Sequence, residues 1–450
     1  MTELSAVARR AVEAATAAGA GDAEAYVQRE SGRTVRVHGG EVESLTAAVQ
    51  TGAGVRAWIG HRVGYAYGTD LSEAGVAALA ARAAEAAAVA DEDEFAAPPR
   101  PAGFEALPGL GDPSVGEWEA SRVADLAIAV ERTALGSDPR LVAVEQAVYA
   151  DGEEQVAIAS STGVAGEYMS SSCYAYLQAL AEGEGARETG LGFGLARGPR
   201  GLDPEAIGAE GARRALEMIG AGKPASRSCP VVLDETVASS FVGLIGAGLG
   251  ARAAQRGRSP FAGRLGEEVA SEAFALHDDG RAPEGTASAP FDAEGVPRRR
   301  TALIEGGSLR SYLYDTYTAN REGRGSTGSA SRQGYRSLPS VAASNLIVAP
   351  GARSFEQLLA EADEGVYVND VAGLHSGVNP VTGVFSVGAS GRMIRGGALA
   401  EPVREFTIAG ELVALLGAVR AAGSQPRWVP FGGSVSTPPL LIAEMAISGS

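Results

Sequence analysis

Hydrophobic positions near the start of the chain follow first the period of a helix and then the two-residue period of strands. Leu4, Val7 and Val12 share one helical face, which predicts an amphipathic helix over residues 3–18. Leu71–Ala90 predicts a second, alanine-rich helix. Four strand-like runs lie between them, the last two joined by the tight turn Gly60-His61: Ala23–Gln28, Thr34–His38, Ala53–Ile59 and Arg62–Tyr67.

A proline-rich connector, Ala96–Ser114, separates these elements from a further helix predicted over Val115–Leu135. Asp-Gly is a strong hairpin signal, so we expect a turn at Asp151-Gly152. Its strands would be Leu141–Tyr149 and Glu153–Ser160, with Val164–Leu180 extending the same sheet. Asp203 and Pro204 have the residue types of an N-cap and a first helical position, which predicts a helix from there to about Ile219.

The second half begins with a linker, Gly220–Ser228, a strand, Cys229–Leu233, and an apolar helix, Thr236–Ala254. The glycine-rich remainder predicts a helix near Glu411–Ala421 and strands at Arg300–Ile304, Ser308–Tyr314, Ser344–Val348, Gly365–Val368, Phe385–Ala389 and Arg392–Arg395. The predicted fold class is α+β, with helix-flanked antiparallel sheets. We expect two domains, 1–225 and 226–450, the second of them rich in β-structure.

Charge and composition narrow the classes of function. The formal net charge is −17, which disfavours nucleic acid as a partner because DNA binders need a basic surface. No apolar stretch reaches the ~20 residues of a membrane span, and the N-terminus lacks the apolar core of a signal peptide. Cys173 and Cys229 are too few for a disulfide framework. We therefore expect a cytoplasmic protein with no membrane partner.

The usual catalytic motifs are absent from the sequence. The four histidines are His38, His61, His277 and His375, and no two of them lie three to five residues apart. This spacing excludes HExxH and HExxxH, in which two histidines on one helical face bind zinc. No serine lies in G-x-S-x-G, the motif of the α/β-hydrolase nucleophile.

Several stretches nevertheless resemble one protein family. Residues 373–388 read GLHSGVNPVTGVFSVG, which is similar to a long and specific signature of the TldE/PmbA branch of the TldD/PmbA family. Leu313–Ala319, followed by Thr327–Ala330, resembles a second block of that family. The opening domain is similar at Ala25-Tyr26-Val27, Gly52–Ile59 and Tyr65-Ala66-Tyr67. The resemblance thus spans almost the whole chain and implies a two-domain fold of TldD/PmbA type.

The resemblance also locates a degenerate metal site. In the TldD branch, a helix after a strand carries HExxxH, whose histidines bind zinc and whose glutamate is the general base, and a cysteine near the C-terminus completes the ligands. Here Asp234 and Ser239 occupy the two histidine positions, and only Glu235 fits the motif. The stretch Trp428–Ser434 contains no cysteine. The resemblance implies no metal, no cofactor and no catalytic residue in this chain, with zinc held by a TldD-type partner.

Asp234 and Glu235 have a simpler interpretation as well. Carboxylates suit the N-terminus of a helix electrostatically. Adjacent helical residues also point about 100° apart, so the two side chains do not converge as a catalytic pair would. Helix capping is therefore the favoured interpretation of both residues.

Two groups of residues are candidates for contacting a peptide or the partner subunit. The first is in the signature loop: His375, Ser376, Asn379 and Thr382. The alternative for this loop is an Asx-type turn, in which Asn379 and Thr382 bond to their own backbone. The second group, Tyr317 and Arg321, belongs to an aromatic and basic cluster with Tyr312, Tyr314 and Arg324. That cluster either lines a channel for peptides or is simply a strand ending in a surface loop.

The leading hypothesis is a non-catalytic subunit of a heterodimeric zinc metallopeptidase. Such a subunit would bind an HExxxH-bearing partner and help enclose unfolded or leader peptides, and the isolated chain could also form a homodimer. Three alternatives stay open. They are a stand-alone regulatory or peptide-binding protein, a hydrolase that uses Glu235 without zinc, and an auxiliary protein in the maturation of modified peptide natural products.

Overall fold

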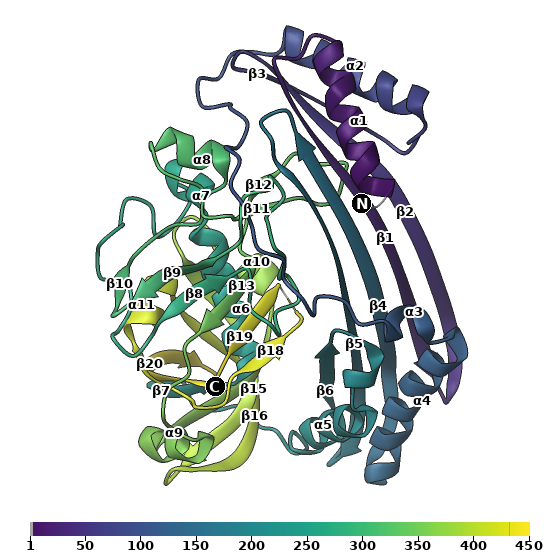
Figure 1. Cartoon of the computed structure of the whole chain (residues 1–450). Coiled ribbons are helices and arrows are strands. Elements are labelled where there is room, and N and C mark those ends of the chain that lie inside the picture. Colours follow the sequence, from purple (N-terminus) through teal and green to yellow (C-terminus); the bar gives the residue numbers. More distant parts are fainter. Residues whose placement is uncertain (1–2, 432) are drawn as a thin grey trace.

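The N-terminal half is built on one six-stranded antiparallel sheet. A computed structural model describes residues 3–431 and 433–450, and its strand order here is β3-β2-β1-β4-β5-β6. The strands are long and curved and form one wall of the molecule (Figure 1). Their bounds are β1 Asp22–His38, β2 Glu41–Ile59, β3 Arg62–Gly68, β4 Leu141–Ser160, β5 Ala165–Gly183 and β6 Ala186–Ala196.

The strands are longer than the sequence pattern predicts. The two predicted strands Ala23–Gln28 and Thr34–His38 form one continuous strand, β1. The prediction of a hairpin turn at Asp151-Gly152 was wrong. Gly152 lies within β4 and pairs with Gly32 of β1. Arg33 of β1 forms an ion pair with Asp151, and the Tyr149 hydroxyl donates to the same carboxylate at 2.7 Å. These partners hold the Asp-Gly dipeptide extended. The predicted turn at Gly60, between β2 and β3, is confirmed.

Four helices cover one face of this sheet. The odd-numbered residues of β1, from Ala23 to Val37, point toward them and are buried where the helices pack. Helices α1 (Glu3–Ala17) and α2 (Glu73–Val89) pack at one end, and α4 (Ala120–Ser137) and α5 (Pro204–Leu216) at the other (Figure 1). Asp203 caps α5 as predicted, accepting from the backbone amides of Glu205 and Ala206. Short turns of helix at α3 (Ser114–Glu117) and η1 (Pro199–Gly201) complete this half.

The C-terminal half contains two further six-stranded sheets, so the α+β class is confirmed. One has the order β10-β9-β8-β13-β19-β18. The other has the order β16-β15-β14-β7-β20-β17, and an added β16–β20 pairing closes it into a barrel. Most pairs are antiparallel, but β14–β7 and β13–β19 are parallel. The strands of the barrel sheet are β7 Arg227–Leu233, β14 Gly365–Ala372, β15 Val384–Arg395, β16 Ala398–Glu411, β17 Val419–Ala422 and β20 Leu440–Ser448.

The remaining elements of this half are short. The strands are β8 Leu276–Asp279, β9 Arg300–Glu305, β10 Ser308–Leu309, β11 Ala330–Ser331, β12 Ser340–Val341, β13 Asn345–Val348, β18 Arg427–Val429 and β19 Ser434–Thr437. The helices are α6 Glu235–Gly248, α7 Ala251–Gln255, α8 Thr316–Arg321, α9 Phe355–Ala362, α10 Leu374–Gly377 and α11 Leu412–Gly417. The predicted helix Thr236–Ala254 is thus two helices, because the chain becomes extended at Gly250. The predicted strand Ser308–Tyr314 is only two residues long.

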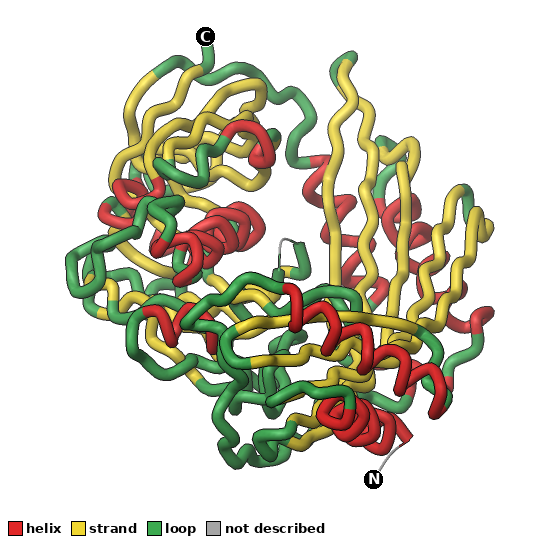
Figure 2. Tube along the Cα trace, turned by 90° about the horizontal axis from the view of Figure 1, so that it is seen from above, coloured by secondary structure: helices red, strands yellow, loops and turns green. Residues whose placement is uncertain are grey.

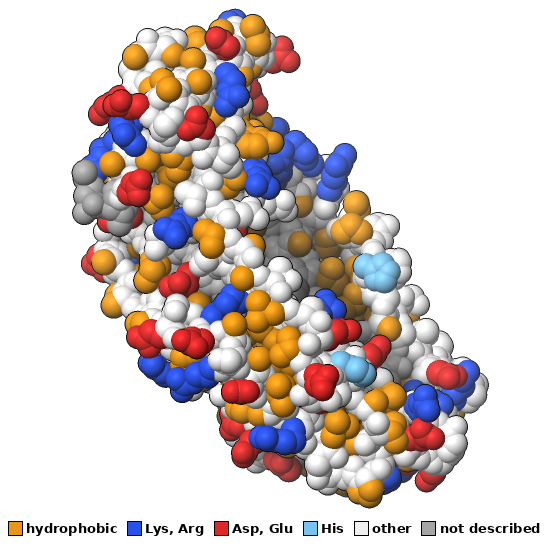
Figure 3. Space-filling model, turned by 90° about the vertical axis from the view of Figure 1, so that its right-hand side faces the viewer, with side chains coloured by type: hydrophobic (Ala, Val, Ile, Leu, Met, Phe, Trp, Pro, Cys, Tyr) orange, Lys and Arg blue, Asp and Glu red, His pale blue; other side chains and the backbone are white. Residues whose placement is uncertain are grey.

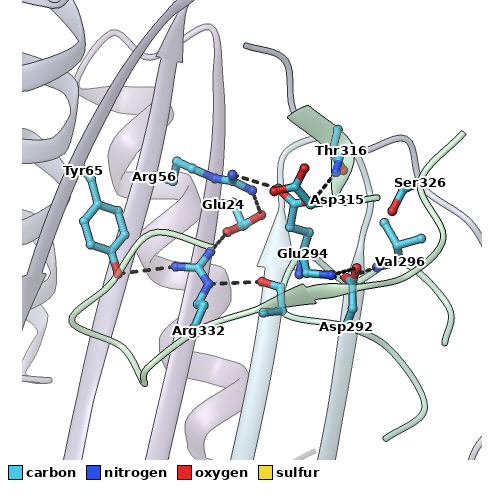
Figure 4. A network of polar contacts seen from close by, with 12 residues as sticks. Glu24, Arg56, Tyr65, Asp292, Glu294, Val296, Asp315, Thr316, Ser326 and Arg332 are labelled. Atoms are coloured by element: carbon cyan, nitrogen blue, oxygen red, sulfur yellow. Dashed lines mark hydrogen bonds and ion pairs between the residues drawn. The ribbon is translucent and has the colours of Figure 1, made fainter. Parts of the chain in front are cut away.

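A buried ion network joins the two halves (Figure 4). Arg56 of β2 donates to Glu24 of β1 at 2.6 Å and to Glu294 of the C-terminal half at 2.9 Å. Arg332 forms a second ion pair with Glu24. Burial alone would lower the pKa of Arg56, but the charges of Glu24 and Glu294 raise it above its ordinary value, so the guanidinium stays charged. The even-numbered face of β1 is therefore fastened to the second half by ions.

Viewed from above, the barrel half and the N-terminal sheet stand opposite each other, joined along one side (Figure 2). The surface in Figure 3 is hollowed near its middle, and basic and acidic side chains are interspersed on that face. Within residues 3–431 and 433–450, no helix has the length and apolar character needed to cross a bilayer.

Candidate functional site

The helix that carries the degenerate motif begins directly after a buried barrel strand. β7 lies between β14 and β20, and its last residues, Val231 to Leu233, are fully buried. Asp234 follows and is the N-cap of α6, since its Oδ1 accepts from the Val237 amide at 2.8 Å. Capping of this helix by Asp234 was the favoured interpretation, and this bond confirms it.

A guanidinium neutralises this aspartate. Asp234 is completely buried, and its Oδ2 accepts from Arg214 Nη1 at 2.9 Å and from the Thr236 hydroxyl at 3.0 Å. Burial alone would lower the pKa of Arg214, but the charges of Asp234 and Glu210 raise it. Both carboxylate oxygens of Asp234 are therefore committed, and the cation beside them belongs to α5 of the N-terminal half.

The other two motif positions do not form a reactive group. Ser239 is buried, and its hydroxyl donates to the Thr236 carbonyl at 2.8 Å within the helix. Glu235 is half-buried, and burial, followed by the nearby charge of Asp234, raises the pKa of its carboxyl group.

These residues do not fit a zinc ion. A catalytic zinc site needs three protein ligands and an open position. In the part of the chain that the structure describes, no group of three or more His, Cys, Asp or Glu side chains is arranged to hold a metal. The position that carries the first histidine in the active motif instead holds an aspartate paired with arginine.

An open cavity of about 310 Å³ lies beside α6, between the two halves of the molecule. Thr236 and Ser240 of α6, Asn369 and Ser390 of the barrel sheet, and Gln178 and Thr189 of the N-terminal sheet line it. Arg404 and Glu188 form an ion pair of 2.5 Å in its wall. The lining also includes the charged side chains of Arg214 and Asp370 and apolar residues such as Leu191 and Met218, so the cavity is mixed in character.

The ion pair at Asp234 continues away from the helix into a chain of charges. Arg214 Nε donates to Glu210 at 3.2 Å, one turn earlier on α5. Both oxygens of Glu210 also accept from Arg427 of β18, at 2.6 and 2.8 Å. The sequence patterns did not predict a role for Arg214, Glu210 or Arg427. The i,i+4 spacing of Glu210 and Arg214 was the available signal, but it points equally to an ordinary surface pair.

The signature loop lies at the surface. His375, Ser376, Asn379 and Thr382 are all exposed. Asn379 Oδ1 accepts from the backbone amides of Val381 and Thr382 at 2.9 and 3.2 Å, which is the Asx-turn arrangement given above as the alternative. His375 and Ser376 are in the short helix α10, where the Ser376 hydroxyl donates to the Gly373 carbonyl at 3.3 Å. Contact of the loop with a peptide or partner stays a prediction.

The structure divides the predicted aromatic and basic cluster. Tyr312 and Tyr314 are buried, so of the two interpretations left open, a channel lining does not apply to these two side chains. Tyr317 donates to Asp93 at 2.8 Å, and the Arg321 guanidinium lies 5.5 Å from the Phe95 ring. These two side chains thus fasten the connector between the N-terminal helices to α8. Among the described residues, no hydrogen bond or ion pair joins them to the signature loop.

Comparison with protein-family models covers most of the chain. Three family models match: PmbA/TldA metallopeptidase domain 1 over residues 23–87, the central domain over 113–219, and the C-terminal domain over 226–449. A protein named metalloprotease from Methanothermobacter thermautotrophicus is 30% identical, over 71% of this chain and 72% of its own length. The chain belongs to the PmbA/TldD family.

Further relatives agree with this assignment. The metalloprotease PmbA homolog of Haemophilus influenzae is 28% identical, over 98% of this PmbA/TldD chain and 95% of its own length. The crystal structure of TldE from Thermococcus kodakarensis superposes with a TM-score of 0.91 at 22% identity, over 98% of this chain and all of that one. At that identity the superposition shows a shared fold and no more.

Proposed function

We propose that this PmbA/TldD chain is the non-catalytic, TldE-type subunit of a heterodimeric zinc metallopeptidase. It would bind a TldD-type HExxxH subunit in the cytoplasm and help enclose unfolded or leader peptides for cleavage. The observation that carries the proposal is the buried ion pair between Asp234 and Arg214 at the position of the first metal-binding histidine. A guanidinium beside this carboxylate opposes the approach of a divalent cation.

Two further observations support a role in enclosing peptide. The cavity beside α6 is lined by both halves, so a chain held there would contact the N-terminal sheet and the barrel together. The signature loop also exposes two aliphatic side chains, Val381 and Val384, next to His375 and Asn379. Exposed apolar side chains among hydrogen-bonding groups are typical of surfaces that bind another chain.

The test is to purify this chain alone, its HExxxH partner alone, and the two together. We expect zinc far below one equivalent in this chain, and peptide hydrolysis only when the partner is present. Glu235→Gln should leave the activity of the assembled complex unchanged, because Glu235 has no metal to serve. Stoichiometric zinc in this chain, or hydrolysis without the partner that is lost in Glu235→Gln, would show that it is an enzyme in its own right.

A further inference from the structure

The outer edge of β2 is open along about half of its length. β2 is paired on one side with β1 from Glu41 to Trp58, but on the other side β3 pairs only with Ala53–Ile59. Among the described residues, no strand pairs with the outer edge between Ser44 and Thr51. In an antiparallel strand every second residue points its N–H and C=O away from its neighbour, so this segment presents a row of free backbone donors and acceptors.

This segment has none of the usual protection of an edge strand. Natural edges are blunted by charged side chains, proline or a β-bulge. Ser44–Thr51 reads SLTAAVQT, without a charge or a proline, and the one bulge of β2 lies before it, where Glu43 has no partner on β1. A long uncharged edge without these devices readily adds another strand.

The large exposed aliphatic side chains of the segment lie on one face. Leu45 is 45% exposed and Val49 is 63% exposed, and both lie on the helix-covered face of the sheet. Leu45 pairs with Val35 of β1, which is fully buried in the core that includes α4, and Val49 pairs with Ser31. β2 forms the outer margin of the wall in Figure 1, on the side that Figure 3 faces. A second strand would cover this margin.

We propose that two copies of this chain associate through their β2 edges, antiparallel and about a two-fold axis at Ala47. In this register Ala47 lies opposite Ala47 of the second copy, and Leu45 lies opposite its Val49. All these side chains are on the same face, so the aliphatic residues of each copy cover those of the other. The N-terminal sheets of the two copies then form one continuous sheet.

Charge selects the antiparallel arrangement. Glu41 and Glu43 precede the segment, and the far end, from Gln50 to Thr51, is uncharged. A parallel pair would place each glutamate beside the same glutamate of the second chain, and these like charges would repel. The antiparallel pair places Glu43 opposite Thr51 instead. The net charge of −17 repels the copies at long range, but at 0.15 M salt this repulsion is screened beyond about 8 Å.

The first experiment measures the mass of the isolated full-length chain by analytical ultracentrifugation at 0.15 M salt. We expect a dimer at micromolar concentration. Val49→Lys should weaken it at least tenfold, because the lysines of both copies would enter the apolar cluster. Val142→Lys, at an exposed aliphatic residue of β4 away from this edge, is the matched control and should leave the dissociation constant unchanged. A monomeric wild-type chain, or a dimer that Val49→Lys leaves intact, overturns the proposal.

A disulfide tests the register. The native cysteines, Cys173 and Cys229, are buried and unpaired, so they do not compete. In the proposed register Ala47→Cys places two thiols directly opposite each other, where the Cα atoms of antiparallel strands are ~4.5–5.5 Å apart, a distance that a disulfide spans. Thr46→Cys is the control, because it would face Ala48 of the second copy. Rapid oxidation to a covalent dimer is expected only for Ala47→Cys. Equal crosslinking of both variants, or none in a folded Ala47→Cys chain, excludes the register.

Discussion

The exposed edges of the N-terminal sheet, at β6 and at β2, differ in what bonds their backbone. At β6, the carbonyl of Phe193 accepts from Arg427 Nη2 at 2.8 Å, and its backbone amide donates to Glu210. The Arg427 guanidinium also lies 3.9 Å from the Phe193 ring. Charged side chains thus take the place of a neighbouring strand. At β2, Arg336 donates to the side chain of Gln50 at 3.3 Å, but among the described residues no charged side chain bonds the backbone of Ser44–Thr51.

One edge is thus bonded by side chains of the same chain, and the other is free to pair with an added strand. The β6 edge is closed by Arg427 and Glu210, and Arg214 links Glu210 to Asp234, so the edge and the degenerate motif belong to one chain of charges between the two halves. An added strand there would have to displace Arg427 and leave Glu210 partly uncompensated. The β2 edge bears no charge, so an added strand displaces only water. The same sheet therefore has one edge that holds the chain together and one that can hold a second chain.

The largest expected effect comes from removing Arg214, which links Asp234 to Glu210 beside the closed β6 edge. Arg214→Met would leave Asp234 as an uncompensated charge with no exposed surface. Breaking a buried ion pair on one side costs about 3–5 kcal/mol, so the free energy of unfolding should fall by about that amount. Urea denaturation, followed by circular dichroism, measures it.

Arg213→Met is the matched control for Arg214→Met. Arg213 is the neighbour of Arg214 on α5, and its ion pair with Glu217 lies at the surface. Surface pairs contribute about 0–1 kcal/mol, so the control should unfold nearly like the wild type. Equal losses in the two variants would mean that the Asp234 position does not depend on its cation.

A smaller effect is expected from opening the β6 edge. Arg427→Leu removes the guanidinium that bonds Glu210 and the Phe193 carbonyl, while Arg214 still neutralises Asp234. The arginine side chain is partly exposed, so we expect a loss of only about 1–2 kcal/mol. Hydrogen exchange is the sharper measurement, because the amide of Phe193 should exchange faster while the amides of β1 do not change. Unchanged protection at Phe193 would show that the ions do not close this edge.

Much of the fold follows from the sequence, because periodicity records which faces are buried. The alternation of Ala53–Ile59 and Arg62–Tyr67, together with a glycine turn, predicted the β2–β3 hairpin. The capping residues Asp203 and Pro204 likewise predicted the start of α5. Local patterns of this kind need no knowledge of distant partners.

What the sequence could not supply are contacts between distant segments. Asp151-Gly152 is a hairpin signal in isolation, and it stays extended because Arg33, more than a hundred residues earlier, holds the carboxylate. The resemblance identified Asp234 as the position of a lost ligand. That Arg214 of α5 neutralises this aspartate is visible only in the folded chain. Open edges are equally hidden, since a strand pattern does not reveal which side lacks a neighbour.

The smallest expected effect is a difference in pH dependence between the two edges. Burial opposes ionisation of Glu210, but its bonds with Arg427 and the charge of Arg214 hold its pKa below the ordinary value. The unfolded chain therefore takes up a proton on Glu210 at a higher pH than the folded chain does. The stability that this group contributes is present above about pH 4.3 and is lost as the pH falls through the folded pKa.

Glu210→Gln should remove this part of the acid sensitivity, so the variant and the wild type should differ less in urea midpoint at pH 4 than at pH 7. The β2 segment Ser44–Thr51 contains no titratable side chain. The dissociation constant of the proposed dimer should therefore stay constant between pH 7 and pH 5.5. A dimer that dissociates over that range would place charged groups in the contact, which the β2 edge does not have.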